Sequence, residues 1–275
     1  MAVELRSRHD ITIEAFRRIA WNGEKIIVAE ETMRSIDTSR GDFLDFLGRN
    51  PDFRVYGVNI GAGDAAEARL NAEQQADYLT GLTSATSFGA PLPERVTRGI
   101  VLARMASFLG GHAAVTSQLV QHVADMLGGP LPPVPAEGNG GSGEILALGH
   151  LFASVPTRVR LGVKEPMALI NGSPCASALV TDTALRCVGA IHLAERVLAL
   201  AADALQAPHE HFAAALGAMW DDVDEIAALT AVRSLLCGGD PRRRAKQALV
   251  SVRVIPKVLA AAYRARAGAS IVAAT

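Results

Sequence analysis

The sequence predicts a mainly α-helical protein, and three observations support this fold class. Apolar residues make up 49% of the 275 residues and charged residues 20%, which is enough for a sizeable core and excludes overall disorder. The apolar residues recur mostly at helical spacing, and only one short segment alternates as a strand would. A positive mean hydropathy and many alanines favour helices that bury more than one face, as in a bundle or at subunit contacts.

Charge and hydropathy argue against several classes of partner. The 27 basic and 28 acidic residues give a net charge of −1, so nothing indicates binding to nucleic acid or to a membrane. The N-terminus is charged, unlike a signal peptide, and the most apolar stretch, residues 188–205, contains charged side chains that lipid disfavours. Three widely spaced cysteines indicate reduced thiols in a cytoplasmic protein rather than a disulfide framework.

The first third of the chain is predicted to form short helices separated by extended or glycine-rich segments. Thr12 starts an amphipathic helix, and an extended segment at residues 26–28 precedes a second helix that contains Ile36. The alternating stretch FRVYGV (Phe53–Val58) predicts a short extended segment that enters a glycine loop. A further helix is expected at residues 71–82.

Residues 94–127 are predicted to be helical, with a break at Gly110-Gly111. The composition then changes sharply at residues 128–143, where prolines and glycines exclude both a helix and a central strand. A flexible linker between two domains is one interpretation of this segment. Against it, helical sequence of the same apolar kind resumes directly at Glu144.

The last part of the chain predicts long helices. An apolar turn at residues 167–174 leads into a helix at about residues 175–205. Two more helices are expected, around residues 211–237 and 245–266. An acidic cluster at residues 221–225 and a basic cluster at residues 242–246 are most simply solvated faces.

The segment GNGGSG (Gly138–Gly143) matches the G-x-G-x-x-G pattern of dinucleotide-binding loops. That pattern needs a preceding strand and an acidic residue about 20 positions later, inside a βαβ unit. Here a proline-rich coil precedes the segment and helices surround it, which disfavours a nucleotide site.

A different chemistry fits Gly141, Ser142 and Gly143 better. A serine between two small residues can cyclise when the amide nitrogen of the third residue attacks the carbonyl carbon of the first, and dehydration then yields a methylidene-imidazolone ring. Glycine at the third position allows the backbone to fold back this closely. The ring is an electrophile that no ordinary side chain supplies, although a Gly-Ser-Gly triad is too common to identify a site by itself.

Four motifs in sequence order place this triad in a specific context. The triad lies in GGSGEILALGH (residues 140–150); YGVNIG (residues 56–61) lies upstream, and EPMALING (residues 165–172) and QALVSVRVIPKV (residues 247–258) lie downstream. Together the motifs resemble those of the histidine/phenylalanine/tyrosine ammonia-lyase and aminomutase family, whose cofactor is 4-methylidene-imidazol-5-one (MIO). The resemblance implies that the MIO forms from the Gly-Ser-Gly triad.

The resemblance also implies roles for individual residues. Tyr56 would lie on a mobile loop and remove the β-proton of the substrate, which requires a lowered pKa or a basic neighbour. Asn171 would hold the cofactor and the substrate amine, and Arg253 would bind the substrate carboxylate through a bidentate fork. Each residue has a structural alternative: Tyr56 as a buried tyrosine in a turn, Asn171 as a helix cap, and Arg253 as a partner of the acidic cluster.

Several positions depart from the family pattern. Gly141 replaces alanine and Glu144 replaces aspartate, which are small changes, whereas Val250 stands where the family has a second tyrosine. Thr83-Ser84 falls where the histidine-specific members carry Ser-His, so histidine is a less favoured substrate. Ser84 and Gln247 are expected to be supporting substrate contacts.

Length is the largest departure, because family members are usually much longer. The resemblance implies an ammonia-lyase-like fold with a cofactor-bearing domain and the start of a helical bundle at residues 1–205, and a further bundle segment at residues 206–275. The first hypothesis is a subunit of a split ammonia-lyase or 2,3-aminomutase for an aromatic-type amino acid. A second chain would supply the C-terminal half in a homo- or hetero-oligomer. The alternative is a catalytically inactive family member that acts as a binding or regulatory subunit.

Overall fold

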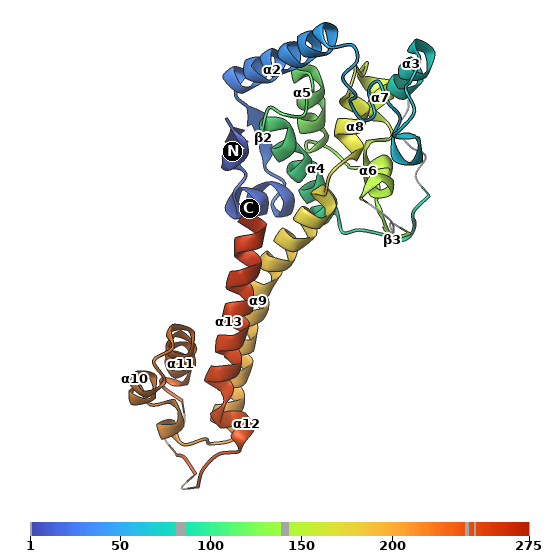
Figure 1. The fold of residues 1–275 in the computed structure, drawn as a ribbon. Coiled ribbons are helices and arrows are strands. Elements are labelled where there is room, and N and C mark those ends of the chain that lie inside the picture. Colours follow the sequence, from blue (N-terminus) through green and yellow to red (C-terminus); the bar gives the residue numbers. More distant parts are fainter. Residues whose placement is uncertain (1, 81–85, 139–142, 240–241, 245, 275) are drawn as a thin grey trace. The chain divides into compact units, whose positions relative to one another are not determined.

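The computed structural model describes residues 2–80, 86–138, 143–239, 242–244 and 246–274 (Figure 1). The chain divides into two compact units, Met1–Asp182 and Thr183–Thr275. Helices dominate both units, and the strands of the described part form two two-stranded sheets in the first unit. The predicted mainly α fold class is therefore confirmed.

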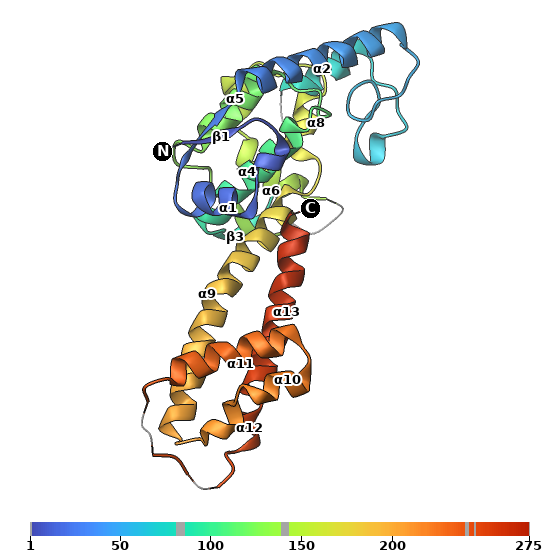
Figure 2. The ribbon, with the colours of Figure 1, turned by 90° about the vertical axis from the view of Figure 1, so that its left-hand side faces the viewer.

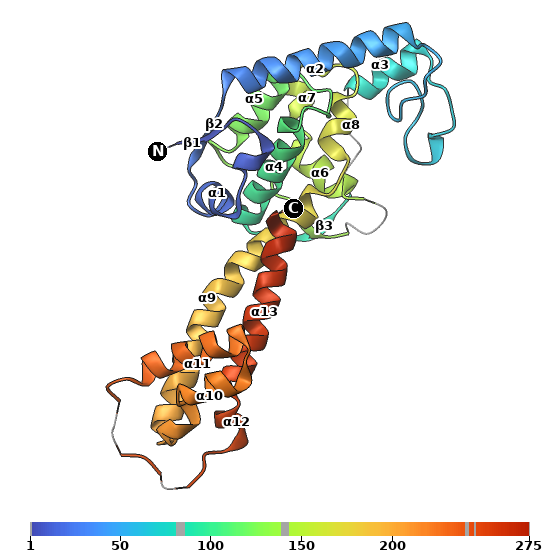
Figure 3. The same ribbon diagram turned by 60° about the vertical axis from the view of Figure 1, so that its left-hand side comes forward.

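The helices and strands of the first unit surround one buried helix. In chain order they are β1 (Ala2–Leu5), α1 (Ile13–Phe16), β2 (Lys25–Val28), α2 (Glu30–Arg49), α3 (Ala72–Thr80), β3 (Phe88–Pro91), α4 (Glu94–Leu109), α5 (Ser117–Met126), β4 (Pro135–Glu137), α6 (Ile145–Phe152), α7 (Val155–Arg158), α8 (Glu165–Ile170) and the first part of α9 (Pro174–Ala204). Strands β1 and β2 pair in parallel. Helix α4 is buried along most of its length and packs against α2, α5 and the π-helical turn that follows α1 (Figure 3).

Two helix boundaries of this unit fall where the sequence predicts them. The Thr12 hydroxyl accepts a hydrogen bond from the Ala15 N–H at 3.1 Å and so caps the start of α1. The helical region expected at residues 94–127 is interrupted between α4 and α5. Gly111 lies in this interruption with a φ of +76°, a left-handed conformation that glycine adopts without strain.

The stretch Phe53–Val58 enters a glycine loop, as predicted, but forms no regular strand. Within it only Tyr56 forms a strand-like bridge, to Ile60, and the following residues form a turn. The Asn59 side chain closes this loop, because its Oδ1 accepts the Val55 N–H and its Nδ2 donates to the Phe53 carbonyl, both at 2.7 Å. A side chain that bonds to nearby backbone competes with strand pairing.

The proline- and glycine-rich segment belongs to the first unit over its described residues 128–138. Its strand β4 pairs antiparallel with β3. Val134, just before β4, is completely buried, and its carbonyl accepts the Leu92 N–H at 2.8 Å. The interpretation of this segment as a flexible linker between domains is therefore wrong for residues 128–138.

A buried carboxylate joins three segments at the start of α8. Glu165 is 0% exposed, and its Oε1 accepts the backbone N–H and the hydroxyl of Thr116, both at 2.7 Å. Its Oε2 accepts the Gly162 N–H at 2.6 Å, and Arg40 of α2 lies 4.0 Å from Oε1. Arg40 itself donates to the carbonyls of Ala114 and Val163. The start of α8 is thus fixed to α2 and to the loop before α5.

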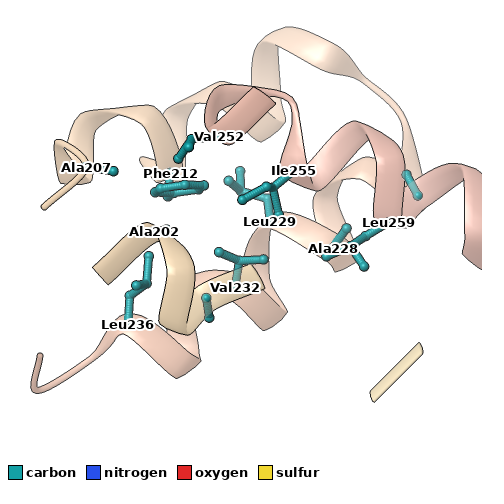
Figure 4. Packing of buried hydrophobic residues seen from close by; sticks show 12 residues of the cluster. Ala202, Ala207, Phe212, Ala228, Leu229, Val232, Leu236, Val252, Ile255 and Leu259 are labelled. Carbon is teal, nitrogen blue, oxygen red and sulfur yellow. The ribbon is translucent and has the colours of Figure 1, made fainter. Parts of the chain in front are cut away.

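The second unit has a core of its own. It contains α9 from residue 183 onward, followed by α10 (Ala215–Trp220), α11 (Val223–Leu236), α12 (Val250–Arg253) and α13 (Ile255–Ala274). Within this unit α13 runs beside α9, and α11 packs against α13 (Figure 2). Phe212, Leu229 and Val252 lie together at the centre of the buried cluster, and Ala202 on α9 and Leu259 on α13 belong to it (Figure 4).

Two of the helices predicted in this unit are interrupted. The helices expected around residues 211–237 and 245–266 are each divided in two, because Asp221 turns into a left-handed conformation after α10 and α12 ends just before α13. The expected domain boundary at residue 205 falls one residue after the end of α9, and the division into residues 1–205 and 206–275 stays a prediction.

The two charged clusters of the second unit are more than solvated faces. Asp222 caps α11 by accepting the N–H groups of Asp224 and Glu225, and it pairs with Arg264 at 3.1 Å. Arg243 of the basic cluster pairs with Asp203 at 2.7 Å. These clusters therefore join elements of the unit.

Within the part of the chain that the structure describes, no helix combines the length and the apolar character that crossing a lipid bilayer requires.

The Glu165 contacts predict a large and specific loss of stability. Glu165→Ala is expected to lower the free energy of unfolding by about 3–5 kcal/mol, because it leaves the buried Arg40 without its counter-charge and the Thr116 and Gly162 donors without their acceptor. Urea denaturation measures this change. The control is Glu30→Ala on α2, whose side chain is 93% exposed and whose loss should stay within about 0.5 kcal/mol. Equal effects of the two substitutions would show that the buried carboxylate does not anchor α8.

Candidate active site

A cavity in the first unit brings together two of the residues that the sequence singles out. It has a volume of about 480 Å³, within the usual range for small-molecule sites. Tyr56 and Asn171 both line it, although 115 positions of sequence separate them (171 − 56). Arg104, Lys164 and Met167 are further lining residues. A phenol, an amide and two cations therefore border one space.

Tyr56 is held in a loop that forms many of its own hydrogen bonds. Its side chain is partly exposed, at 38%, and its hydroxyl accepts the Gly63 N–H at 2.7 Å. The tyrosine is therefore not the buried side chain that the structural alternative requires.

Gly57 brings this loop against α8. It has a φ of +65°, and a Cβ added at Gly57 would lie 2.3 Å from Cγ of Met167. Only glycine satisfies both the left-handed backbone and this close approach. The contact between Gly57 and Met167 therefore holds the tyrosine loop against α8, the helix that ends just before Asn171.

Asn171 follows the last turn of α8, where its N–H donates to the Met167 carbonyl at 2.9 Å. Its carbonyl accepts a hydrogen bond from Nη2 of Arg104. Its side-chain Oδ1 accepts the Gly172 N–H at 3.2 Å. The backbone of Asn171 is thus held by α8 and by Arg104, and Asn171 lines the cavity. Asn171 is a helix-terminal residue, as the structural alternative says, and it also lines the cavity.

Arg104 is the buried charge of this site. It lies on α4 and is 4% exposed, and its Nε is buried without a hydrogen-bond partner among the described residues. Burial lowers the pKa of Arg104 to about 10, whereas the nearby Cys175 and Glu144 side chains raise this pKa. The guanidinium therefore remains charged at neutral pH, and the cavity carries positive charge from Arg104 and Lys164.

The triad itself lies mostly outside the described residues. Gly141 and Ser142 are not described, so the structure gives no account of them. Gly143 is described with a φ of +91°, and a Cβ there would meet no atom of the described residues within 4 Å. Glu144, the next residue, accepts the N–H groups of Cys175 and Ala176 at 2.5 and 2.7 Å, so its carboxylate caps the start of α9.

Three other predicted site residues lie outside the described part of the first unit. Ser84 lies outside the described residues. Gln247 and Arg253 belong to the second unit. Gln247 is exposed, and Arg253 donates from Nε to the Ala248 carbonyl at 3.1 Å. The alternative that Arg253 pairs with the acidic cluster receives no support from this contact.

The sequence motifs missed Arg104 and Lys164. The signal for Arg104 was a single charge within the apolar run GIVLARMASFL, since a buried arginine in such a helix usually has a partner or a function. Lys164 lies at the start of α8 with a φ of +75°, an unusual conformation for a residue with a side chain. Among the described residues, no three His, Cys, Asp or Glu side chains gather as a metal-binding group.

Comparison with known proteins identifies related sequences. The family model for aromatic amino acid lyases matches residues 11–158 and 153–275. A histidine ammonia-lyase of Geobacillus sp. (strain WCH70) is 24% identical over 287 residues, which cover 93% of this chain and 56% of the relative. A histidine ammonia-lyase of Paracidovorax citrulli is 27% identical over 290 residues, covering 91% and 55%. The chain thus spans just over half the length of these relatives.

Solved structures share the fold. The tyrosine aminomutase of Streptomyces globisporus superposes with a TM-score of 0.82 at 23% identity, covering 100% of this chain and 61% of that one. The phenylalanine aminomutase of Pantoea agglomerans gives a TM-score of 0.85 at 17% identity, covering 98% and 61%. At these identities the likeness concerns the fold alone.

Gly57→Ala tests the contact between the tyrosine loop and α8. We expect it to lower the free energy of unfolding by about 1–3 kcal/mol more than its control, because the new methyl group displaces Met167. The control is Gly63→Ala in the same loop, where the φ is +59° but a Cβ would meet nothing within 4 Å. Chemical denaturation of both variants gives the difference. Equal losses would mean that backbone strain alone, and not Met167, requires the glycine.

The cysteines should differ in reactivity. Burial raises the pKa of the Cys175 thiol, and the nearby Glu144 carboxylate raises it further, so Cys175 stays protonated and unreactive at neutral pH. Cys237 is exposed. Iodoacetamide at about pH 8 should label Cys237 and leave Cys175 unlabelled until the protein is denatured. Peptide mass spectrometry reads the result, and rapid labelling of native Cys175 would contradict this burial.

Proposed function

Because the chain belongs to the aromatic amino acid lyase family, we propose that it forms part of an ammonia-lyase or 2,3-aminomutase that acts on an aromatic-type amino acid. One observation carries the proposal: Tyr56 and Asn171, from separate motifs, line one cavity large enough for an amino acid. The names of the relatives, which are histidine ammonia-lyases and aromatic aminomutases, support this class of reaction.

The proposed cofactor is MIO formed from Gly141, Ser142 and Gly143. The residues around the triad fit such a group. Gly143 has the backbone freedom that ring closure needs, and no described atom would crowd a Cβ at this position. Glu144, the residue after the triad, is hydrogen-bonded to the start of α9. When formed, this group supplies the electrophile that allows ammonia to leave from an unactivated amino acid.

The chain's own residues would perform the remaining tasks. Tyr56 would remove the β-proton of the substrate, and the electrons of that C–H bond would form the Cα–Cβ double bond as the Cα–N bond breaks. Asn171 would orient the amine, and Arg253 would bind the carboxylate with Gln247 and Ser84 as supporting contacts. The products would be ammonia and an α,β-unsaturated acid, and readdition of ammonia at the β-carbon would make the enzyme a mutase.

We further propose a second polypeptide that supplies the segment matching the rest of the relatives' length. An exposed apolar face supports this proposal. In the second unit Leu193, Val197 and Leu200 of α9 are 63%, 55% and 69% exposed. Their spacing places them on one face of the helix, where contiguous apolar side chains typically mark an interaction surface. The assembly would be a homo- or hetero-oligomer.

Intact-mass spectrometry of the purified chain tests the cofactor. We expect a mass deficit of two water molecules, located in the peptide that contains residues 139–145, because cyclisation and dehydration each release one. Ser142→Ala should show the full calculated mass. Ser154→Ala is the control, because Ser154 lies outside the triad and its variant should retain the deficit.

The same mass measurement distinguishes the enzyme from the alternative, a catalytically inactive binding or regulatory subunit. A deficit at the triad, together with release of an α,β-unsaturated acid, supports the enzyme. An unmodified mass, both alone and after co-production with a candidate partner chain, would remove the cofactor claim and leave the binding or regulatory subunit as the better hypothesis.

A further inference from the structure

Arg104 contacts one of the proposed catalytic residues although no motif includes it. Nη2 of Arg104 donates to the backbone carbonyl of Asn171, which lies 67 positions further along the chain. Burial of an arginine is unfavourable unless its contacts compensate for the lost hydration. Arg104 is 4% exposed and lines the cavity, so its hydrogen bond to Asn171 is one of the contacts that must compensate for its burial.

The turn between α8 and α9 is held at both ends by charges from other parts of the unit. Arg104 of α4 holds the carbonyl of Asn171 at one end. Glu144 holds the N–H groups of Cys175 and Ala176 at the other, at 2.5 and 2.7 Å. Between them Gly172 has a φ of +92°. Hydrogen bonds to ionised groups are stronger than neutral ones, so two such anchors restrict the turn more than its own backbone contacts do.

Arg104 engages the main chain of Asn171 and leaves the side-chain amide available. Apart from its bond to the adjacent Gly172 N–H, the side-chain amide of Asn171 makes no hydrogen bond to another described residue. The guanidinium thus fixes the peptide group from which the side chain extends while the amide remains able to bind a ligand in the cavity.

We propose that Arg104 is a positioning residue: together with Glu144 it fixes the turn at residues 171–176 and thereby sets the direction of the Asn171 side chain in the cavity. The catalytic consequence rests on the proposed function, whereas the effect on the turn does not. Misplacement of a catalytic amide by about 1 Å can lower the rate about 100-fold, which is the scale of effect expected from loss of Arg104.

Helix α4 offers a matched control in Arg98. Arg98 is 8% exposed and also donates to a backbone carbonyl, that of Ile19, from both Nε and Nη2 at 3.1 Å. It is not among the residues that line the cavity. Arg98→Met therefore removes the same kind of buried contact from the same helix without touching the turn at residues 171–176.

Hydrogen–deuterium exchange of the full chain tests the structural part. In Arg104→Met and in Glu144→Gln, the peptide covering residues 171–176 should exchange about tenfold faster than in the wild type. Arg98→Met should leave that peptide unchanged and affect the contacts of Ile19 instead. Arg104→Lys, which keeps a charged donor, should restore part of the protection, and it replaces Arg104→Met if that variant does not fold. Unchanged exchange in the Arg104 and Glu144 variants, or equal acceleration in Arg98→Met, would overturn the proposal.

Kinetics of the complete enzyme, with its partner chain, tests the catalytic part. Arg104→Met should lower kcat about 100-fold with a much smaller change in KM, and Arg98→Met should lower kcat less than about threefold. A variant pair with equal kcat values would overturn the positioning role. Absence of any product from the wild type would count against the proposed function, whereas the exchange experiment would still decide whether Arg104 fixes the turn.

Discussion

The structure of the first unit depends on one buried carboxylate. Glu165 is completely buried, and it satisfies donors from the loop before α5 and from Gly162 while Arg40 of α2 lies nearby. A charge in such surroundings is tolerated only when nearly all its partners are present, so it permits one arrangement of these segments and disfavours others. Helix α8 starts at Glu165. The contacts of this carboxylate therefore also determine where Met167 and Asn171, which line the cavity, are placed.

The site combines helix α8, which Glu165 positions, with loops that a few specific contacts hold in place. The tyrosine loop meets α8 through Gly57, and the turn after α8 is held by Arg104 and Glu144. Functional side chains are often carried by loops that a scaffold positions, because loops allow side chains to converge from distant parts of the sequence. Here charged and steric contacts, rather than long secondary-structure elements, bring Tyr56 and Asn171 to one cavity.

Local signals in the sequence predicted much of the fold and part of the site. Thr12 marked a helix start and Gly110-Gly111 a break, because capping and backbone freedom act within a few residues. The alternation of Phe53–Val58 does not produce a regular strand, since the Asn59 side chain hydrogen-bonds to the backbone of that segment. Motif resemblance drew attention to Tyr56 and Asn171, which line the cavity. Arg104 was not predicted, because its partner is distant in sequence and no local pattern encodes the contact.

Met167 connects the shape of the cavity with the support of the tyrosine loop. One side chain both lines the cavity and packs against Gly57. A substitution that enlarged or reduced the cavity to admit a different substrate would therefore also shift the loop that carries Tyr56. Under the proposed function, the choice of substrate and the placement of Tyr56 are coupled through Met167, so a change of specificity should require paired substitutions in α8 and in the loop.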